Sequence, residues 1–388
     1  MKYTEEIRFV IARLEGAGHE AYLVGGALRD ALLGREGNDF DVTTSATPEE
    51  MQAIFSDVPT IATGLKHGTL TVMVDGRPIE ITTFRVDGEY LDARHPASVC
   101  FTRSLAEDLA RRDFTVNAMA YNEKTGLVDL YGGRDDLARG LIRAVGEPEK
   151  RFREDALRIL RAFRFASKLG FAIEQKTLAA ARVCREGISM VSAERITAEL
   201  KGILLGENAS RALSLMEASG VLSLVLPEAV ADPKIAALSA HFETRLAFLL
   251  GGVEESALAA RLRALRLSNA EVDAVTRLVH AAADFVPCES EGEVRRLMAQ
   301  MGALWEPLLE LLAVRGVLVD GLRDTAARCR ARGDCLAIRD LAIDGRDLLA
   351  HGRQGKEVGA ILAFLLARVL DDPSLNQRET LLALADAF

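Results

Sequence analysis

Hydrophobic and polar positions change their period twice within the first 34 residues. The apolar side chains of residues 5–17 recur with the 3.6-residue period of an amphipathic helix, at Ile7, Val10, Ile11 and Leu14. Residues 22–24 form a short apolar run that predicts a strand, and Gly25-Gly26 interrupts it. The composition of residues 27–33 favours a helix, for which Gly34 is a suitable end. The pattern therefore predicts a helix, a strand, a glycine turn and a second helix.

Strand patterns dominate the next part of the chain. Residues 69–74 and 78–84 are rich in β-branched residues and are separated by Asp75-Gly76-Arg77, which predicts a β-hairpin. Upstream of them, Thr47-Pro48 followed by two acidic residues predicts the start of a helix. Residues 87–101 have mixed polarity and no clean period, so we expect a flexible loop there.

From residue 149 onward the strand patterns almost disappear. Residues 151–169 have a helical period whose core-facing stripe consists of Ala156, Ile159, Leu160 and Phe163. Polar residues recur every three positions on the other face of this helix, at Asp155, Arg158, Arg161 and Arg164. Ser192 is a suitable N-cap for a further helix. The pattern predicts a mixed α/β N-terminal domain followed by a helical remainder.

Candidate chemistry is concentrated after the first strand. A strand, a Gly-Gly turn and a helix N-terminus together form a phosphate cradle, to which Arg29 adds a cationic group. Asp39 and Asp41 follow in an extended segment, where residues two apart point to the same face. Two carboxylates repel unless a cation joins them, and this spacing suits Mg²⁺ that also holds substrate phosphates. A surface pair beside a turn is the alternative, but the Gly-Gly-x-x-Arg-Asp sequence upstream favours the metal site.

Two further polar groups extend this hypothesis. Glu80 alternates with Ile79 and Ile81, so it either faces the same metal site from a neighbouring strand or is an exposed strand residue. A second group crowds into seven residues, at Arg111, Arg112, Asp113 and Asn117. Paired arginines suit phosphate recognition, and Asp and Asn suit ribose hydroxyls. A solvated charged helix end is the alternative for this second group.

Composition narrows the class of protein. With 388 residues, of which 49% are hydrophobic and 27% charged, the chain is typical of a globular protein of two to four domains. Its net charge of −9 argues against a coat of non-specific nucleic-acid-binding charge, although residues 151–185 are locally basic. Five scattered cysteines predict free thiols in a reducing cytoplasm. The longest apolar runs, such as residues 360–367, are too short to span a membrane, and no signal peptide is expected at the N-terminus.

The order and spacing of these motifs resemble those of the bacterial class II tRNA nucleotidyltransferases, the CCA-adding enzymes. This family shares its catalytic head with bacterial poly(A) polymerases. The matching motifs are Gly25-Gly26-Ala27-Leu28-Arg29-Asp30, Asp39-Phe40-Asp41, residues 80–85, residues 111–118, residues 154–158 and Glu194-Arg195. Each motif alone has weak to moderate specificity, but their combination is highly specific and covers most of the chain.

The resemblance implies an α+β nucleotidyltransferase head, with a mixed β-sheet and helices, followed by an all-α neck, body and tail in a seahorse-like arrangement. The implied domains are the catalytic head at residues 1–145, the base-selecting neck at 146–206, the body at 207–335 and the tRNA-binding tail at 336–388. The implied partner is the 3′ end and acceptor arm of tRNA, with no membrane and no protein partner. Either a monomer or a homodimer is expected.

The resemblance also implies template-independent addition of C, C and A to the 3′ end of tRNA from CTP and ATP. Asp39 and Asp41 would hold two Mg²⁺ ions, and Glu80 would assist as a third carboxylate. Residues implied to contact the nucleotide are Gly25, Gly26, Arg29, Arg112, Arg161 and Arg164. Two more, Asp113 and Asn117, would favour ribose over deoxyribose. The pair Asp155 and Arg158 would act as an amino-acid template that hydrogen-bonds the Watson–Crick edge of C and then of A.

Two further sites bear on which activity within the family is expected. Gly251-Gly252 stands where many relatives carry His-Asp, so no phosphohydrolase activity is predicted and His241 and His280 are interpreted as structural. CC-adding relatives have a shortened loop, whereas this chain keeps residues 87–96, with Tyr90, Asp92 and Arg94. Full CCA addition is favoured over addition of A alone.

Two other classes are disfavoured. A poly(A) polymerase would carry a long basic C-terminal extension, but residues 341–388 contain five Lys/Arg against seven Asp/Glu. A catalytically inactive tRNA-binding module or a nucleotide sensor would be signalled by loss of Asp39 or Asp41, and both are present.

Overall fold

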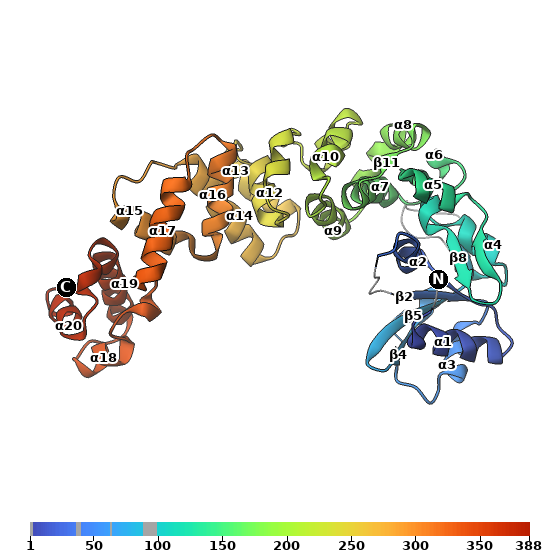
Figure 1. Ribbon diagram of the computed structural model, residues 1–388, viewed down its shortest axis with the longest axis horizontal. Helices are drawn as coiled ribbons and strands as arrows, with labels where there is room; N and C mark the ends of the chain where they lie inside the picture. The colour runs from blue at the N-terminus through green and yellow to red at the C-terminus, as the bar shows by residue number, and fades with distance from the viewer. Residues whose placement is uncertain (1–2, 36–39, 63, 88–98) are drawn as a thin grey trace. The chain divides into compact units, whose positions relative to one another are not determined.

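The computed structural model describes residues 3–35, 40–62, 64–87 and 99–388. The chain forms two compact units (Figure 1). Unit 1 comprises Met1–Ala236 with Ala264–Arg266, and unit 2 comprises Ala237–Arg263 with Leu267–Phe388.

Unit 1 is built on a mixed sheet that has seven strands within the described residues, in the order β3-β4-β5-β2-β1-β8-β9. The strands are β1 (Ala21–Val24), β2 (Phe40–Thr44), β3 (Thr60–Ile61), β4 (Thr69–Val74), β5 (Arg77–Thr83), β8 (Met119–Asn122) and β9 (Gly126–Asp129). Neighbouring strands run antiparallel except β2 and β5, which are parallel and place Asp41 opposite Glu80. The predicted hairpin of β4 and β5 is confirmed, and its turn residues Asp75 and Gly76 both have positive φ, as a type I′ turn requires.

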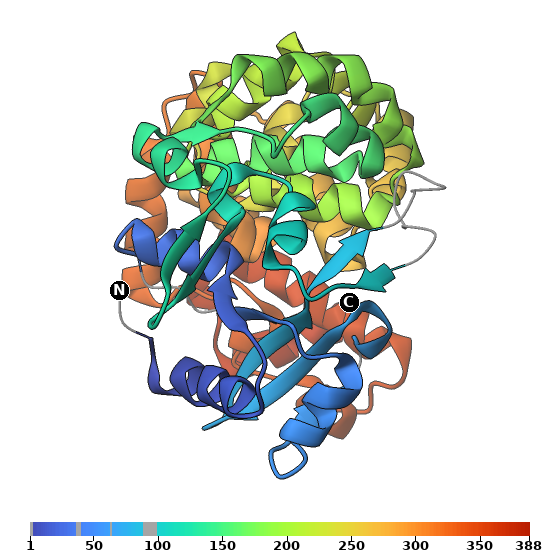
Figure 2. The ribbon, with the colours of Figure 1, turned by 90° about the vertical axis from the view of Figure 1, so that its right-hand side faces the viewer.

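Helices cover both sides of this sheet. Helices α1 (Glu5–Gly16) and α3 (Pro48–Ile54) lie on one side and α2 (Gly25–Leu32) on the other (Figure 1). The blue strands of the sheet and α1 can also be followed in Figure 2. The predicted α1 is confirmed, with Ile7, Val10, Ile11 and Leu14 buried. The expected start of α3 is confirmed by a capping box at Thr47. One detail differs from the prediction, because α2 begins directly at Gly25, without an intervening turn.

The region expected to be a loop at residues 87–101 has strands at its two ends. Strand β6 (Arg85–Asp87) pairs antiparallel with β7 (Val99–Phe101), so the loop prediction is wrong at those ends. Cross-strand hydrogen bonds decide this pairing, and a search for local periodicity does not detect them. Residues 88–98 lie outside the described residues, and with them the loop residues Tyr90, Asp92 and Arg94.

The rest of unit 1 is mainly helical. Its further elements are α4 (Leu105–Ala110), η2 (Thr115–Asn117), α5 (Gly133–Arg139), β10 (Leu141–Ile142), α6 (Pro148–Glu154), α7 (Leu157–Leu169), β11 (Ala172–Ile173), α8 (Gln175–Cys184), η3 (Arg185–Met190), α9 (Ala193–Leu204), α10 (Ala209–Ala218) and α11 (Leu222–Val225). Strand β10 pairs in parallel with β11. The expected N-cap at Ser192 precedes α9.

The helix expected over residues 151–169 is interrupted. Asp155 has extended backbone angles, φ −142° and ψ 104°, and separates α6 from α7. Its Oδ1 accepts a hydrogen bond from the N–H of Leu157 at 3.0 Å, and its Oδ2 pairs with Arg195 at 2.9 Å. These contacts stabilise the break because they replace the intrahelical bonds that a continuous helix would make. The core-facing stripe is confirmed, since all four of its residues are buried, at Ala156, Ile159, Leu160 and Phe163.

Unit 2 is helical throughout the part of it that is described. Its elements are η4 (Pro233–Ala237), which begins in unit 1, α12 (Phe242–Leu249), α13 (Glu255–Ala264), α14 (Asn269–Ala283), α15 (Glu291–Met301), η5 (Gly302–Leu304), α16 (Trp305–Val314), α17 (Asp320–Arg332), η6 (Ile338–Asp340), α18 (Gly345–Ala350), α19 (Lys356–Asp371), η7 (Pro373–Leu375) and α20 (Arg378–Asp386). The mixed N-terminal sheet and the helical remainder confirm the predicted fold class. The boundaries of head, neck, body and tail stay a prediction.

Two features of unit 2 bear on sequence expectations. By length and composition alone, one segment of the described residues, Glu291–Val314, could cross a membrane. It is divided at Gly302, whose φ is +56°, and Trp305 and Leu308 after the division are buried, so we interpret it as core helices of unit 2. A Cβ at Gly251 would lie 2.6 Å from Nη2 of Arg315. A side chain at this position would therefore require the end of the Arg315 side chain to move.

All five cysteines of the chain, each within the described residues, are free thiols, as expected.

Candidate active site

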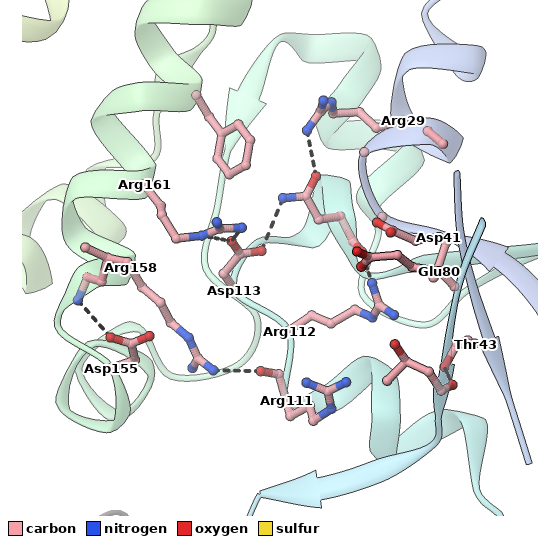
Figure 3. Close-up of a pocket in the computed structure, with 18 of the residues that line it drawn as sticks. Arg29, Asp41, Thr43, Glu80, Arg111, Arg112, Asp113, Asp155, Arg158 and Arg161 are labelled. Atoms are coloured by element: carbon pink, nitrogen blue, oxygen red, sulfur yellow. Dashed lines mark hydrogen bonds and ion pairs between the residues drawn. The ribbon is translucent and has the colours of Figure 1, made fainter. Parts of the chain in front are cut away.

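A pocket of about 930 Å³ in unit 1 gathers almost all of the predicted site residues (Figure 3). Twelve of the thirteen line it, namely Gly25, Gly26, Arg29, Asp41, Glu80, Arg112, Asp113, Asn117, Asp155, Arg158, Arg161 and Arg164. The thirteenth, Asp39, lies outside the described residues. The sheet, the α2 N-terminus, the segment after α4 and helix α7 each contribute to the lining.

Carboxylates form the acidic edge of the pocket. Asp41 on β2 and Glu80 on β5 are register partners on parallel strands, so both side chains project from the same face of the sheet (Figure 3). Gly25 packs against the first of these carboxylates, since a Cβ there would lie 2.9 Å from Oδ2 of Asp41. Within the described residues no cluster of three or more His, Cys, Asp or Glu side chains has the arrangement of a metal site. Two carboxylates with a glycine beside them nevertheless fit a hard divalent cation that also binds phosphate oxygens.

A chain of hydrogen bonds crosses the pocket from α2 to α7. Nη1 of Arg29 donates to Oδ1 of Asn117 at 2.9 Å, and Nδ2 of Asn117 donates to Oδ1 of Asp113 at 3.2 Å. The other oxygen of Asp113 accepts from Nε of Arg161 at 2.7 Å (Figure 3). Arg29 is also paired with Asp30 at 2.8 Å. These contacts hold both arginines, which come from two different helices, in fixed orientations.

The electrostatics of Asp113 keep it ionised. Burial raises the pKa of this carboxyl, but the charge of Arg161 and hydrogen bonds from Arg161, Asn117 and the N–H of Phe114 outweigh burial and hold the pKa at about 2. The same pairing raises the pKa of the Arg161 guanidinium, although burial opposes it. Asp113 is therefore a charged hydrogen-bond acceptor at neutral pH.

A second buried carboxylate binds the neighbouring arginines Arg111 and Arg112. Asp108 is fully buried and accepts from Arg111 at 2.8 Å, from Arg112 at 3.2 Å and from the hydroxyl of Thr43 at 3.3 Å. Burial raises the pKa of Asp108, but the two guanidinium charges outweigh it and lower the pKa. Nη1 of Arg112 also donates to the carbonyl of Asn117 at 3.3 Å. Nε of Arg112 is buried and has no hydrogen-bond partner among the described residues.

The expected base-reading pair lies in the pocket but not on a single helix. Asp155 sits in the break before α7 and is held by Arg195 at 2.9 Å. Arg158 is buried on α7, where it donates to Glu154 at 2.9 Å. It also donates to the carbonyl of Arg111 at 2.9 Å (Figure 3). The acceptor and the donor of the pair therefore come from different local structures and are each held by neighbours.

Further residues outside the set of thirteen also line the pocket, among them Thr43, Thr82, Arg111, Phe165 and Arg195. Strand alternation could have revealed the two threonines, because Thr43 and Thr82 follow Asp41 and Glu80 by two positions. Arg111 belongs to the arginine pair interpreted above as suited to phosphate recognition, and Arg195 belongs to a recognised motif for which no role is predicted. An apolar residue such as Phe165 on a helix gives no sequence signal for a binding site.

Two protein-family models match the chain. One is described as the poly A polymerase head domain and matches residues 21–143. The other is described as a probable RNA and SrmB-binding site of polymerase A and matches residues 170–232. The first spans all seven described strands of the sheet, and the second lies in the helical part of unit 1.

Known proteins resemble the chain over most or all of its length. The CCA-adding enzyme of Geobacillus stearothermophilus is 45% identical over 290 residues, which are 72% of this chain and 70% of the relative. That of Geobacillus kaustophilus strain HTA426 is 37% identical over 393 residues, which are 98% of this chain and 96% of the relative. The crystal structure of Bacillus stearothermophilus CCA-adding enzyme in complex with CTP has a TM-score of 0.82 at 36% identity, and the match covers 100% of this chain and 98% of that one.

Proposed function

The chain belongs to the family of CCA-adding enzymes, which are tRNA nucleotidyltransferases, and from this premise we propose how its pocket carries out the reaction. The enzyme adds C, C and A to the 3′ end of tRNA, consuming CTP and ATP and releasing pyrophosphate. One observation supports our assignment of roles: twelve residues from distant parts of the chain converge on a pocket of about 930 Å³.

Asp39 and Asp41 are proposed to hold two Mg²⁺ ions, with Glu80 assisting as a third carboxylate. The register of Asp41 with Glu80 and the close approach of Gly25 to the Asp41 carboxylate support this assignment. Bound there, Mg²⁺ would lower the pKa of the attacking 3′-hydroxyl and neutralise the oxygens of the leaving pyrophosphate.

The N-terminus of α2 and the pocket arginines bind the triphosphate. Backbone N–H groups of Gly25 and Gly26 lie at the positive end of the helix and have no side chain to block a phosphate. Arg29 and Arg112 are held by internal hydrogen bonds, so they keep their orientation without reorganising when the phosphates arrive. Because these groups are fixed in advance, they stabilise the charge that develops on the leaving group.

The pair Asp113 and Asn117 is assigned to the ribose. Asp113 is ionised at neutral pH, so its oxygens accept hydrogen bonds from hydroxyl groups. A deoxyribose lacks one of those donors and would make one hydrogen bond fewer in the pocket, which lowers its affinity.

Asp155 and Arg158 are assigned to the base. Cytosine and adenine both present an exocyclic amino donor next to a ring-nitrogen acceptor, whereas uracil and guanine present a carbonyl next to an N–H. A carboxylate acceptor beside a guanidinium donor therefore matches C and A and opposes U and G. A good bidentate contact of this kind is worth roughly 1–3 kcal/mol of discrimination.

Contacts from the helical part of the chain to the tRNA backbone would supply the rest of the affinity, which should therefore fall with rising salt. We infer that the protein acts in the bacterial cytoplasm, as a monomer or a homodimer.

Three tRNA transcripts test the proposal. They end before CCA, after C and after CC, and each is incubated with the protein, Mg²⁺ and CTP or ATP, singly and together, before the products are sequenced. Completion of CCA on all three is expected, with no addition by the Asp41→Asn variant. Addition of A only to the CC-ended transcript would instead identify an A-adding enzyme, and long A tails on unrelated RNA would identify a poly(A) polymerase.

A further inference from the structure

Three guanidinium groups of the pocket surround one aromatic ring. The Cζ atoms of Arg29, Arg161 and Arg164 lie 5.2, 5.3 and 4.4 Å from the ring centroid of Phe165. Arg29 comes from α2, whereas the other two share α7 with the ring. Phe165 is only 4% exposed and packs edge-on against Phe114, with centroids 5.7 Å apart. The ring is thus the common neighbour of cations from two separate helices.

Each of these cations also has a carboxylate partner. The ion pairs are Arg29 with Asp30 at 2.8 Å, Arg161 with Asp113 at 2.6 Å and Arg164 with Glu199 at 2.6 Å. A carboxylate fixes one side of a guanidinium group, and the negative face of an aromatic ring attracts the cation from another direction. Two attractive partners restrict the orientation of a planar group more than one does.

The choice of a ring matters because the ligand of this pocket is an anion. Three like charges close together repel each other, and a further carboxylate among them would relieve that repulsion. It would also repel the incoming triphosphate. A phenyl ring attracts the cations through its quadrupole and carries no net charge. An aliphatic side chain of similar volume would fill the space without any such attraction.

We propose that Phe165 is a positioning residue for the nucleotide, whose ring face orients Arg29, Arg161 and Arg164 toward the triphosphate and ribose. This inference rests on the proposed function, because it explains how the pocket holds CTP and ATP. Phe165 acts through the arginines, so its contribution depends on the electrostatic character of the ring and not only on its volume.

A fluorination series separates these two contributions. Site-specific replacement of Phe165 by 4-fluoro-, 3,5-difluoro- and pentafluorophenylalanine weakens the ring quadrupole in steps while the ring shape is nearly kept. We expect the Kd for CTP, measured by calorimetry, to rise in steps to about fivefold for the last member, which corresponds to about 1 kcal/mol. The KM for CTP should rise in parallel, kcat should fall because Arg29 also stabilises the leaving group, and the Tm should change little.

Phe163 provides the matched control. It lies on the same helix, is fully buried in the core stripe, and among the described residues no cation lies over its ring. The same fluorination series at Phe163 should leave the Kd for CTP unchanged. If the pentafluoro variant at position 165 fails to fold, the mono- and difluoro variants still give the trend.

The outcomes distinguish the inference from its premise. A Kd that does not depend on fluorination at Phe165, in a protein that still extends tRNA, would overturn the inference and leave the proposed function intact. An equal trend at Phe163 would also overturn it. A wild-type protein that neither binds CTP nor extends tRNA would refute the proposed function itself.

Discussion

Alanine in place of Gly25 would test whether the Asp41 carboxylate must lie against the start of α2. Gly25 has a φ of +69°, and a Cβ there would lie 2.9 Å from Oδ2 of Asp41. Ordinary contact begins at 3.4 Å, so the carboxylate must move by about 0.5 Å. The substitution therefore changes both the backbone strain and the position of a proposed metal ligand.

The two effects have different magnitudes and different readouts. An L-residue with this φ costs about 1–2 kcal/mol of folding free energy. A misplacement of about 1 Å in an active site costs about 100-fold in rate. On that scale a shift of half that size should lower kcat about tenfold, which the strain alone would not do.

Gly34→Ala is the matched control for Gly25→Ala. Gly34 follows the other end of α2, has nearly the same φ of +70°, and would place its Cβ with nothing within 4 Å. Urea unfolding should show a similar loss of stability in both variants. Initial rates of AMP addition to a tRNA ending in CC, at saturating ATP and Mg²⁺, should fall only in Gly25→Ala.

Either of two results would refute this reasoning. Unchanged kcat in Gly25→Ala would mean that the position of the Asp41 carboxylate does not limit the reaction. An equal loss of kcat in both variants would assign the effect to strain in α2 and not to the contact with Asp41.

Three further predictions concern charge. Asp113 has a pKa of about 2, below the value of about 3.9 in an unfolded chain, so its ionised form stabilises the fold above about pH 4. That contribution, about 2 kcal/mol, should be lost as the pH falls from about 4 to about 2. The free energy of unfolding, measured with urea across this range, should therefore depend less on pH in Asp113→Asn than in the wild-type protein. Arg295→Met should destabilise unit 2 by about 3 kcal/mol, because this buried guanidinium caps the carbonyls at the end of α19. Arg323→Met is the control: it removes an exposed ion pair and should change the free energy of unfolding by less than about 0.5 kcal/mol. Fluorescence of the single tryptophan would follow unfolding in both variants. Asp41→Asn should lower kcat by at least about 10²–10³-fold. Glu80→Gln should lower kcat by about tenfold or less, since Glu80 is exposed. Equal losses of kcat in the two variants, measured over a titration with Mg²⁺, would show that both carboxylates have the same role.

Elements whose signals are local could be predicted from the sequence. The capping box at Thr47 and the Asp75-Gly76 turn depend on residues only a few positions apart, so their local sequences predict them. The order of strands in the sheet depends on packing between distant segments, and no local pattern encodes it. The break at Asp155 was missed for the same reason, because its partner Arg195 lies 40 positions further along the chain.

The site was predictable to the extent that its residues carry distinctive chemistry. Glycines, paired arginines and acidic residues at short spacings indicate phosphate and metal binding, and the pocket brings these groups together. Phe165 was not predictable, because its position on α7 indicates only that it is buried. The cation that makes it notable, Arg29, belongs to a helix far away in the sequence.

The parallel pairing of β10 with β11 limits how this enzyme can exchange modules with its relatives. β10 (Leu141–Ile142) depends on β11 (Ala172–Ile173) for its backbone partners, and Asp113 depends on Arg161 for its countercharge. A gene fusion that joined the first 145 residues to foreign helices would leave a strand unpaired and a buried carboxylate without its cation. A chimera joined after residue 173 would inherit both pairs, so the catalytic module is transferable only together with the helix that follows it.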